Sequence, residues 1–299
     1  MQDADDRVTS QLREQVRALR NSDGGWPYYA GKASRIEPTC WALLALAASA
    51  PAPRGAAGAA AAPEIEPLLR WPVQDGWLVD VAGAPVNYAF NALAGIALLQ
   101  RPDGVARGRA MAARLLEVKG LKLEQTPVLR QDNTLQAWPW IDRTFSWVEP
   151  TSLCLLLLKQ RAADMRSTGA ARIAVGEQML IDRVCRDGGW NYGGSNVYGQ
   201  ELWAYVPTTA LGLLAMQDRR DHTVVVRSLA HLEKDLVNER SAVALALAAI
   251  ALRVYRAPEA EALRLLDAAL PASVQLGCVL GMAMGLYAMT DAQVAAFRV

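Results

Sequence analysis

The sequence predicts an all-α protein, an α/α toroid of about six helix pairs around a central apolar cavity. Three observations carry this prediction. The phrase Asp-Gly-Gly-Trp occurs at residues 23–26 and again at residues 187–190. Amphipathic and almost wholly apolar helical patterns alternate along the 299 residues. Degraded copies of the same phrase lie between the two clear ones, and a duplicated unit of this kind is typical of a repeat architecture.

Each copy of the phrase leads through an aromatic connection to a proline and then to an apolar run. In the clear copies the connection ends in Pro-Thr, at residues 38–39 and 207–208. The degraded copies, at residues 75–77 and 138–140, have lost one or both glycines but keep the tryptophan and a following proline. Two further repeats toward the C-terminus have no tryptophan. The order is therefore outer helix, aromatic turn, inner helix, six times over.

The stretch before each turn mixes charged residues with apolar residues three and four apart. This is the pattern of a helix with one buried face. The weakest such stretch, the second, has room for about two turns. Outer helices are expected at residues 5–20, 64–70, 106–118, 170–184, 223–234 and 258–270.

The runs after the proline are apolar on nearly all sides, so both of their faces should be covered. A proline in the first turn and a neighbouring threonine are signals for a helix start. Inner helices are expected at residues 41–48, 89–99, 152–159, 211–216, 241–255 and 272–289.

Helix pairs of this kind can form an open solenoid or close into a ring. An open solenoid needs polar capping repeats, whereas the final inner helix is among the most apolar segments of the chain. We therefore expect a closed ring with the aromatic turns clustered at one end. No linker interrupts the repeats, so residues 1–299 are interpreted as one domain. The low-complexity stretch 50–62 is interpreted as a flexible loop.

Composition excludes several function classes. The net charge is +1 and the basic residues are scattered, so no nucleic-acid partner is expected. The N-terminus is acidic and polar, which does not fit a signal peptide, and no apolar run reaches the roughly 20 residues of a membrane span. The four cysteines have no paired spacing. These features predict a cytoplasmic protein, and they leave contact with a membrane surface and the oligomeric state open.

The turn itself has a physical interpretation. Gly-Gly permits backbone angles that other residues resist, and Asp can hydrogen-bond to the backbone of its own turn. A tryptophan buries a large surface and has one N–H to satisfy. We expect Trp26 and Trp190 to hold neighbouring helices together rather than to contact a ligand.

The Asp-Gly-Gly-Trp turn between paired helices resembles the repeat of the prenyltransferase and squalene–hopene cyclase superfamily. The resemblance covers almost the whole chain, and it is strongest at residues 23–46 and 187–216. In the cyclases a Gln usually stands three residues before the Asp, where this chain has Arg20 and Val184. The resemblance implies a toroid whose greasy central cavity holds an isoprenoid. It identifies a fold more securely than a reaction.

Aromatic residues after each turn are the candidates to line such a cavity. Ring faces stabilise a carbocation by cation–π attraction, at roughly 0.5–2 kcal/mol per ring. Two of them, Trp41 and Phe90, can equally pack between helices. The expected substrate-binding residues are Tyr28, Tyr29, Trp41, Tyr88, Phe90, Trp140, Phe145, Trp147, Tyr198, Trp203 and Tyr205.

Carboxylates at the inner-helix starts are the candidate catalytic acids. Glu37 and Glu149 each stand directly before Pro-Thr, and Asp142 lies in the long third turn. A Glu beside tryptophans can have a raised pKa and act as an acid. Helix-dipole compensation explains the same positions without catalysis. Cyclases of the family use Asp-x-Asp-Asp, which occurs here only at residues 3–6, in the N-terminal tail, where we interpret it as a helix start.

No cofactor and no metal site are expected. The Asp-x-Cys zinc motif of the protein prenyltransferases is absent, and the two histidines, nine residues apart, do not share a helix face. A zinc site built from separate helices stays open. A toroidal glycosidase would need two facing carboxylates, for which Glu37 and Glu149 could serve, but the surrounding apolar helices suit a lipid more than a sugar.

Two functional hypotheses follow from the resemblance. The first is a terpene or squalene cyclase-like enzyme, an isomerase or lyase, that holds an isoprenoid-like hydrophobic molecule and cyclises it by protonation. The second is a non-catalytic toroid that binds an isoprenoid or a protein partner. The aromatic residues favour the first, and the missing acid motif favours the second.

Overall fold

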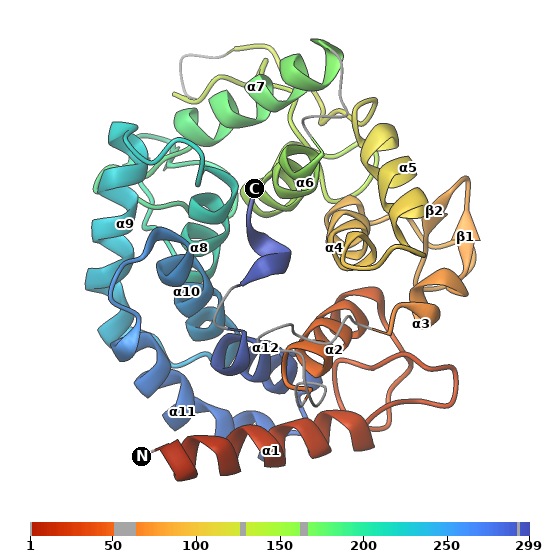
Figure 1. The fold of residues 1–299 in the computed structure, drawn as a ribbon. Helices are drawn as coiled ribbons and strands as arrows, with labels where there is room; N and C mark the ends of the chain where they lie inside the picture. The colour runs from red at the N-terminus through yellow and green to blue at the C-terminus, as the bar shows by residue number, and fades with distance from the viewer. Residues whose placement is uncertain (1, 51–63, 126–129, 162–166, 292–293) are drawn as a thin grey trace.

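The computed structural model describes residues 2–50, 64–125, 130–161, 167–291 and 294–299, of which residues 2–6 are described only as backbone. Figure 1 shows a closed ring of paired helices, which confirms the α/α toroid. The inner helices are α2 (Ile36–Ala48), α4 (Tyr88–Leu99), α6 (Val148–Gln160), α8 (Val206–Ala215), α10 (Ala242–Tyr255) and α12 (Val279–Thr290). The outer helices are α1 (Gln2–Ala18), α3 (Glu66–Leu69), α5 (Val105–Leu115), α7 (Ser167–Asp182), α9 (Thr223–Asp235) and α11 (Ala260–Gln275).

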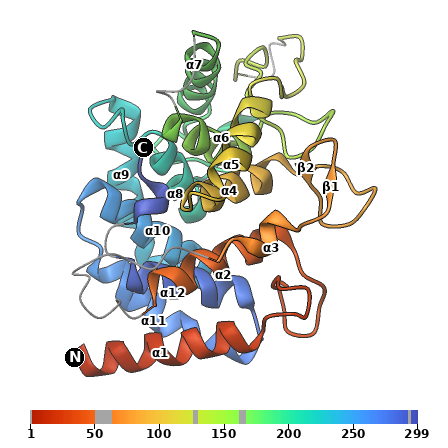
Figure 2. The same cartoon turned by 45° about the vertical axis from the view of Figure 1, so that its right-hand side comes forward.

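The ring closes where the last repeat meets the first. Helix α12 packs against both α2 and α1. The view in Figure 2, turned by 45°, again places the blue and red helices side by side. Closure buries the apolar surface of α12, which an open solenoid would leave exposed.

Two contacts that recur in three of the repeats explain the tryptophan and the threonine. The indole N–H groups of Trp26, Trp138 and Trp190 donate to the carbonyls of Val16, Leu115 and Leu180, at 2.6, 2.8 and 2.6 Å. The backbone N–H of each tryptophan donates to a threonine hydroxyl at the start of the following inner helix, at 2.8, 3.3 and 3.0 Å. All three indoles are buried, so they join an outer helix to its inner partner as expected.

The second repeat uses different residues for the same contacts. The backbone N–H of Leu78, not of Trp77, donates to the side chain of the buried Asn91 at 2.9 Å. Leu78 thus stands where the first, third and fourth repeats have tryptophan, and Asn91 stands where they have threonine. Trp77 belongs to the two-stranded hairpin of β1 (Val73–Gln74) and β2 (Trp77–Leu78).

Neighbouring repeats are joined at a fixed position, two residues beyond this tryptophan. The first N–H of α4, α6 and α12 donates to the carbonyl of Trp140, Tyr192 and Tyr28 respectively, each at 2.9 Å. The first N–H of α2 donates instead to the side chain of Asp80, at 2.8 Å. These bonds satisfy helix N-terminal donors and set the aromatic turns side by side around one end of the ring.

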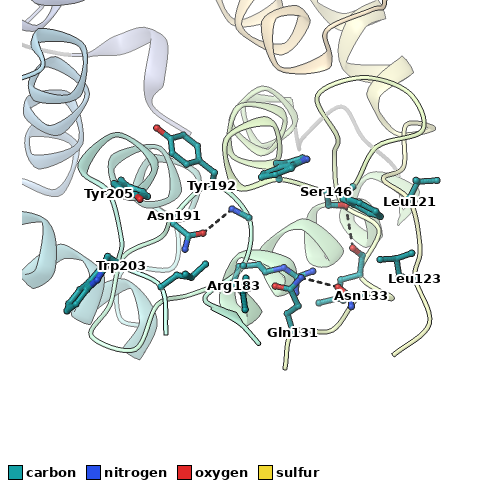
Figure 3. A pocket seen from close by; sticks show the side chains of 17 residues that line it. Leu121, Leu123, Gln131, Asn133, Ser146, Arg183, Asn191, Tyr192, Trp203 and Tyr205 are labelled. Carbon is teal, nitrogen blue, oxygen red and sulfur yellow. Dashed lines mark hydrogen bonds between the residues drawn. The ribbon is translucent and has the colours of Figure 1, made fainter. Parts of the chain in front are cut away.

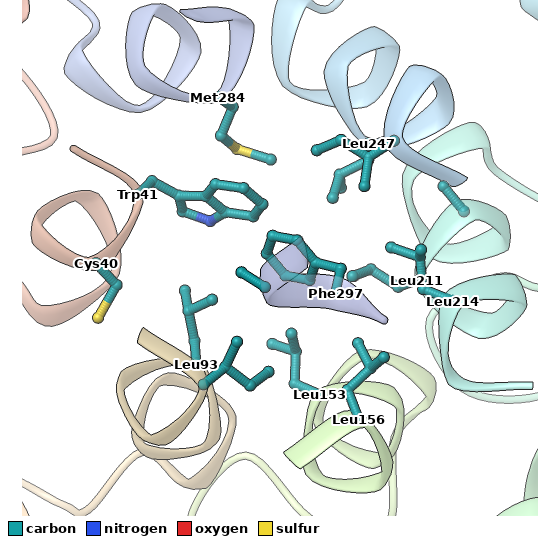
Figure 4. Close-up of a cluster of buried hydrophobic side chains, with 14 of the residues drawn as sticks. Cys40, Trp41, Leu93, Leu153, Leu156, Leu211, Leu214, Leu247, Met284 and Phe297 are labelled. Atoms are coloured by element: carbon teal, nitrogen blue, oxygen red, sulfur yellow. The ribbon is translucent and has the colours of Figure 1, made fainter. Parts of the chain in front are cut away.

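The interior of the ring is filled rather than open. Figure 4 shows the side chains that the inner helices send inward, with Phe297 among them. Phe297 belongs to the short helix η3 (Ala295–Phe297), is fully buried, and stacks on Trp41 with ring centroids 5.0 Å apart. The side chains of Gln160, the last residue of α6, and of Gln217, just beyond α8, donate to the carbonyls of Ala296 and Phe297, each at 2.7 Å.

The last helix pair differs from the expectation. The outer helix expected to end at residue 270 continues through Pro271 to Gln275, and α12 begins at Val279 rather than at residue 272. The chain reverses at Gly277, whose φ of +61° lies in the left-handed region that favours glycine. Hydrophobicity alone did not mark this turn, because apolar residues continue on both sides of it.

Two expectations concern residues that lie outside the described part of the chain. The loop expected at 50–62 lies almost wholly within residues 51–63, and the side chains of Asp3, Asp5 and Asp6 are not described. No helix of the described residues is long and apolar enough to cross a membrane.

Candidate functional site

Two adjoining hollows lie at the end of the ring where the aromatic turns gather. The central cavity has a volume of about 380 Å³ and opens among the first turns of the inner helices. A groove of about 540 Å³ lies between the third and fourth turns. The two share Tyr192 and Tyr205, whose rings are 5.4 Å apart, so these tyrosines form a common wall.

The base of the central cavity is apolar. Each of the six inner helices contributes one side chain to it, and Phe297 lies within the same cluster (Figure 4). Because this layer is packed, the cavity is a shallow bowl rather than a channel through the ring. The six residues are Trp41, Leu93, Leu153, Leu211, Leu247 and Met284.

Two glutamates stand on the wall of the bowl, one turn above this layer. Glu37 and Glu149 occupy equivalent positions in the first turns of α2 and α6, each directly before a buried proline. Both are half-buried by accessible surface. The helix start brings each carboxyl to the mouth of the ring, and burial of its base removes water from around it.

The surroundings of Glu37 favour the charged form more than those of Glu149. Burial raises the pKa of Glu37 to about 7, against a hydrogen bond from the Tyr28 hydroxyl that lowers it, while the negative charge of Asp80 raises it further. The Tyr28 Oη donates to Glu37 Oε2 at 2.5 Å. Hydrogen bonding to a carboxylate stabilises its charge.

Glu149 has no such support. Burial, and then the charge of Glu37, raise its pKa to about 8. Among the described residues, no side chain or backbone group hydrogen-bonds to its carboxyl. Glu149 therefore holds its proton more firmly and is the better acid, whereas the Tyr28 hydrogen bond favours the ionised form of Glu37. Two like carboxyls in one cavity titrate as a pair, so both pKa values belong to the pair as well as to its members.

A third carboxyl completes the acidic wall. Glu239 lines the cavity, and its Oε1 accepts from the N–H groups of Arg240 and Ser241, both at 2.8 Å, just before α10. Among the described residues that line the bowl, none is Lys, Arg or His. The bowl therefore suits a neutral or cationic ligand and disfavours an anion.

The groove combines aromatic, apolar and amide side chains. Figure 3 shows Trp203, Tyr205 and Tyr192 on one side, and Gln131 and Asn133 on the other. Trp203 exposes 79% of its surface. It follows the hairpin of β3 (Asn196–Val197) and β4 (Gln200–Glu201). The buried Arg183 also lines the groove, but its guanidinium is bound to the carboxylate of Asp182 and the carbonyl of Asp132.

The structure brings together only some of the expected site residues. Glu37, Glu149, Trp41 and Tyr205 line the bowl, and Tyr28 contacts it through Glu37. The groove takes Phe145, Trp147 and Trp203, besides the shared Tyr205.

The other expected residues line neither hollow. Asp142 is exposed, and its Oδ1 accepts from the Tyr88 hydroxyl at 2.5 Å. Phe90 and Trp140 pack edge to face against each other, with ring centroids 5.8 Å apart. Tyr29 and Tyr198 expose 50% and 82% of their surface, away from both hollows.

Sequence reasoning missed Asp80, Tyr192 and Glu239. Asp80 and Tyr192 occupy the joining position two residues after the repeat tryptophan or its Leu78 counterpart, so a register across repeats could have found them. Glu239 had a weaker signal, a carboxylate two residues before the Ser241 cap of α10. Among the described residues, no group of three or more His, Cys, Asp and Glu side chains is placed to hold a metal ion.

Comparisons with known proteins bear on the fold. No family model and no curated sequence matches the chain. Two solved structures of GH76A, an α-1,6-mannanase of Salegentibacter sp. HEL1_6, are similar, each with a TM-score of 0.63 over 98% of this chain and 99% of the other. Their sequence identities are 10% and 11%. Both are inactive variants with two successive aspartates replaced, in complex with α-1,6-mannotriose and α-1,6-mannotetrose.

These findings correct the functional expectation. The toroid is right, but the terpene cyclase-like activity, an isomerase or lyase acting on an isoprenoid, is wrong. The similar structures are of a carbohydrate-active enzyme rather than of a cyclase. The physical reason lies in the cavity. The packed layer around Trp41 and Phe297 fills the centre of the ring below the bowl, and carboxyls stand at the mouth. The expectation of a hydrophobic isoprenoid-like partner is corrected with it, because the similar structures hold manno-oligosaccharides.

Proposed function

We propose that this protein is a glycoside hydrolase that acts on a neutral oligosaccharide, with Glu149 as general acid and Glu37 as its partner carboxylate. The observation that carries the proposal is the pair of half-buried carboxyls in one cavity, one hydrogen-bonded and one not. Glycoside hydrolysis commonly uses two carboxyls of this kind, one protonated and one ionised. Different surroundings assign the two roles.

The reaction follows from the protonation states. The Glu149 carboxylic acid donates its proton to the glycosidic oxygen as the bond from that oxygen to the anomeric carbon breaks. Glu37, whose charge is stabilised by the Tyr28 hydroxyl, either takes a proton from the attacking water or attacks the anomeric carbon itself. Water supplies the hydroxyl group of one product and the proton of the other, so no cofactor is consumed.

The sugar class is proposed from charge and from the structural neighbours. The bowl offers carboxyls and tyrosine hydroxyls but no cationic side chain among its lining residues, which disfavours uronate or sulfated sugars. The neighbours were solved with α-1,6-linked manno-oligosaccharides, so these are the first substrates to test. This chain has successive aspartates only at Asp5-Asp6, ahead of the first repeat turn, so its acid pair comes from two different repeats.

The test is hydrolysis of a panel of neutral oligosaccharides, including α-1,6-manno-oligosaccharides, followed by product chromatography. We expect Glu149→Gln and Glu37→Gln each to lower kcat by at least about 100-fold, the usual contribution of general acid–base catalysis. The matched control is Glu233→Gln on the exposed face of α9, which should keep full activity. Absence of hydrolysis across the panel, or equal rates in all three variants, would refute the proposal.

We also propose that the protein works in a reducing compartment such as the cytoplasm. All four cysteines are free, and Cys40, Cys154 and Cys185 are buried. Disulfides persist in oxidising compartments, whereas unpaired buried thiols are common where thiols stay reduced. Cell fractionation with an antibody against the native chain tests this placement, and recovery in the culture medium would contradict it.

A further inference from the structure

The groove beside the bowl has its own unsatisfied polar atoms. Gln131 Nε2 donates to Asn133 Oδ1 at 3.1 Å. The other atoms of the two amides, Gln131 Oε1 and Asn133 Nδ2, are buried and have no hydrogen-bond partner. Asn133 is only 7% exposed. If the oxygen and nitrogen of both amides are exchanged, the two side chains still form one hydrogen bond with each other. One amide N–H and one amide oxygen are again left without a partner.

Buried polar atoms without partners are costly and usually belong to a ligand or to ordered water. The two unused atoms here are complementary, since one accepts and the other donates. A hydroxyl group satisfies both at once, because it donates one hydrogen bond and accepts another. A carboxylate can only accept and an ammonium can only donate, so neither satisfies the pair.

The rest of the groove fits a ring that is apolar on its faces and polar at its edge. Trp203 and Phe145 expose 79% and 44% of their surface. Exposed aromatic surface of this extent gains free energy when an apolar face covers it. The buried Arg183 is bound to Asp182, so the lining carries no free charge. A neutral sugar has hydroxyls at its edge and C–H groups on its faces.

Glycines bring the backbone close to these groups. A Cβ atom on Gly194 would stand 2.2 Å from Gln131 Oε1, and one on Gly193 would stand 3.1 Å from the Trp147 ring. Both glycines line the groove. Any side chain at Gly194 would therefore displace the Gln131 amide, so the cradle depends on glycine there.

We propose that the groove binds the continuation of a neutral oligosaccharide whose reacting sugar lies in the bowl, with a hydroxyl between Gln131 and Asn133 and a sugar face on Trp203. Continuity supports this placement, because Tyr192 and Tyr205 line both hollows. The inference rests on the proposed hydrolase function and adds that the protein favours longer chains over short ones. Each further sugar in the groove adds contacts that a disaccharide in the bowl cannot make.

The experiment measures binding without turnover. Titration calorimetry uses the Glu149→Gln protein with α-1,6-mannotetraose and α-1,6-mannobiose. The tetraose should bind about tenfold more tightly than the biose. Trp203→Ala, Gln131→Met and Gly194→Ala, each added to Glu149→Gln, should each weaken tetraose binding about tenfold and leave biose binding unchanged. Leu276→Ala, an exposed apolar truncation outside both hollows, is the control and should change neither.

Failure of this inference and failure of the hydrolase proposal give different results. If the unsubstituted protein hydrolyses the oligosaccharides but the three groove variants weaken both ligands equally or neither, the groove inference is overturned and the hydrolase stands. If the tetraose binds through the groove but is never hydrolysed, the groove stands and the hydrolase falls. If neither sugar binds, the groove inference is overturned, and the hydrolase proposal is decided by hydrolysis across the wider panel. Circular dichroism of each variant confirms that it is folded.

Discussion

Glu37 and Glu149 show how one sequence position acquires two chemistries. Both precede Pro-Thr at the start of an inner helix, so their positions in the repeat are equivalent. The difference comes from the neighbouring turn. Tyr28 donates its hydroxyl to Glu37, whereas no described residue donates a hydrogen bond to the Glu149 carboxyl. The repeat position thus places each carboxyl at the mouth of the ring, and the hydrogen bonds that the carboxyl accepts set its pKa.

The raised pKa values predict how stability depends on pH. An unfolded chain loses the Glu149 proton near pH 4.5, whereas the folded protein holds it to about pH 8. Because the folded state binds more protons between these values, the free energy of unfolding falls as the pH rises through this window. Glu149→Gln removes the effect. It should raise the free energy of unfolding at pH 8.5 by about 1–3 kcal/mol and change it little at pH 4.5.

Urea denaturation of both proteins at the two pH values measures this difference. Glu233→Gln, on the exposed face of α9, is the control for replacing a glutamate at the surface. A stabilisation by Glu149→Gln that is equal at both pH values would show that the glutamate ionises as freely when folded as when unfolded.

Three of the six repeats are built around a buried tryptophan, and this predicts the cost of altering it. Trp190→Phe removes the indole N–H that donates to Leu180 at 2.6 Å and leaves that carbonyl without its partner. It also leaves space above Gly212, which lacks a side chain where the indole lies: a Cβ there would stand 2.6 Å from the ring. We expect the free energy of unfolding to fall by about 2–4 kcal/mol.

Equilibrium unfolding in urea checks this cost. Trp203→Phe alters a tryptophan that is 79% exposed, so it should change stability by less than about 0.5 kcal/mol. Equal effects of the two substitutions would show that the indole contact does not hold the repeat together.

The elements also show where sequence reasoning succeeds and where it stops. The alternation of amphipathic and apolar patterns predicted the helix pairs and their order, because burial on one or both faces leaves a direct trace in the sequence. The second repeat was misaligned by one residue. Trp77 matched the pattern, but Leu78 makes the contact, and the compensating Asn91 is recognisable only from its bond to Leu78. The contact of Asp80 with Ile36 recurs at the joining position of the repeat, and the misaligned second repeat hid that register.

At the scale of the whole molecule, ring closure decides which aromatic residues line the cavity. The resemblance implied an apolar cavity for an isoprenoid, with these aromatic residues as its lining. In the closed ring much of that aromatic surface packs against other side chains. Trp41 packs on Phe297 and Tyr287, and Phe90 packs on Trp140. Phe297, near the end of the sequence, gave no sign that it would fill the ring. The shape of the site therefore depends on closure and on η3, which no local pattern encodes.

Ring closure predicts how stability is distributed around the molecule. A linear solenoid frays from its ends, because a terminal repeat has only one neighbour. In this ring α12 packs on α2, and Val279 N–H donates to the Tyr28 carbonyl at 2.9 Å, so the first and last inner helices have two neighbours each. Amide hydrogen exchange should therefore give α2 and α12 opening free energies within about 1 kcal/mol of that of α6.

Gly277→Val tests whether closure is the cause. Gly277 has a φ of +61°, and a Cβ there would stand 3.0 Å from the Ala30 Cβ, so a branched side chain strains the junction between the last and first repeats. In this variant α2 and α12 should exchange faster while α6, on the opposite side of the ring, keeps its protection. The matched variant Gly199→Val has the same kind of backbone angle, +78°, but no neighbouring atom within 4 Å, so it controls for backbone strain alone. If the unsubstituted protein already exchanged α12 far faster than α6, the last helix would be fraying despite its contacts with α2, and closure would contribute little to its stability.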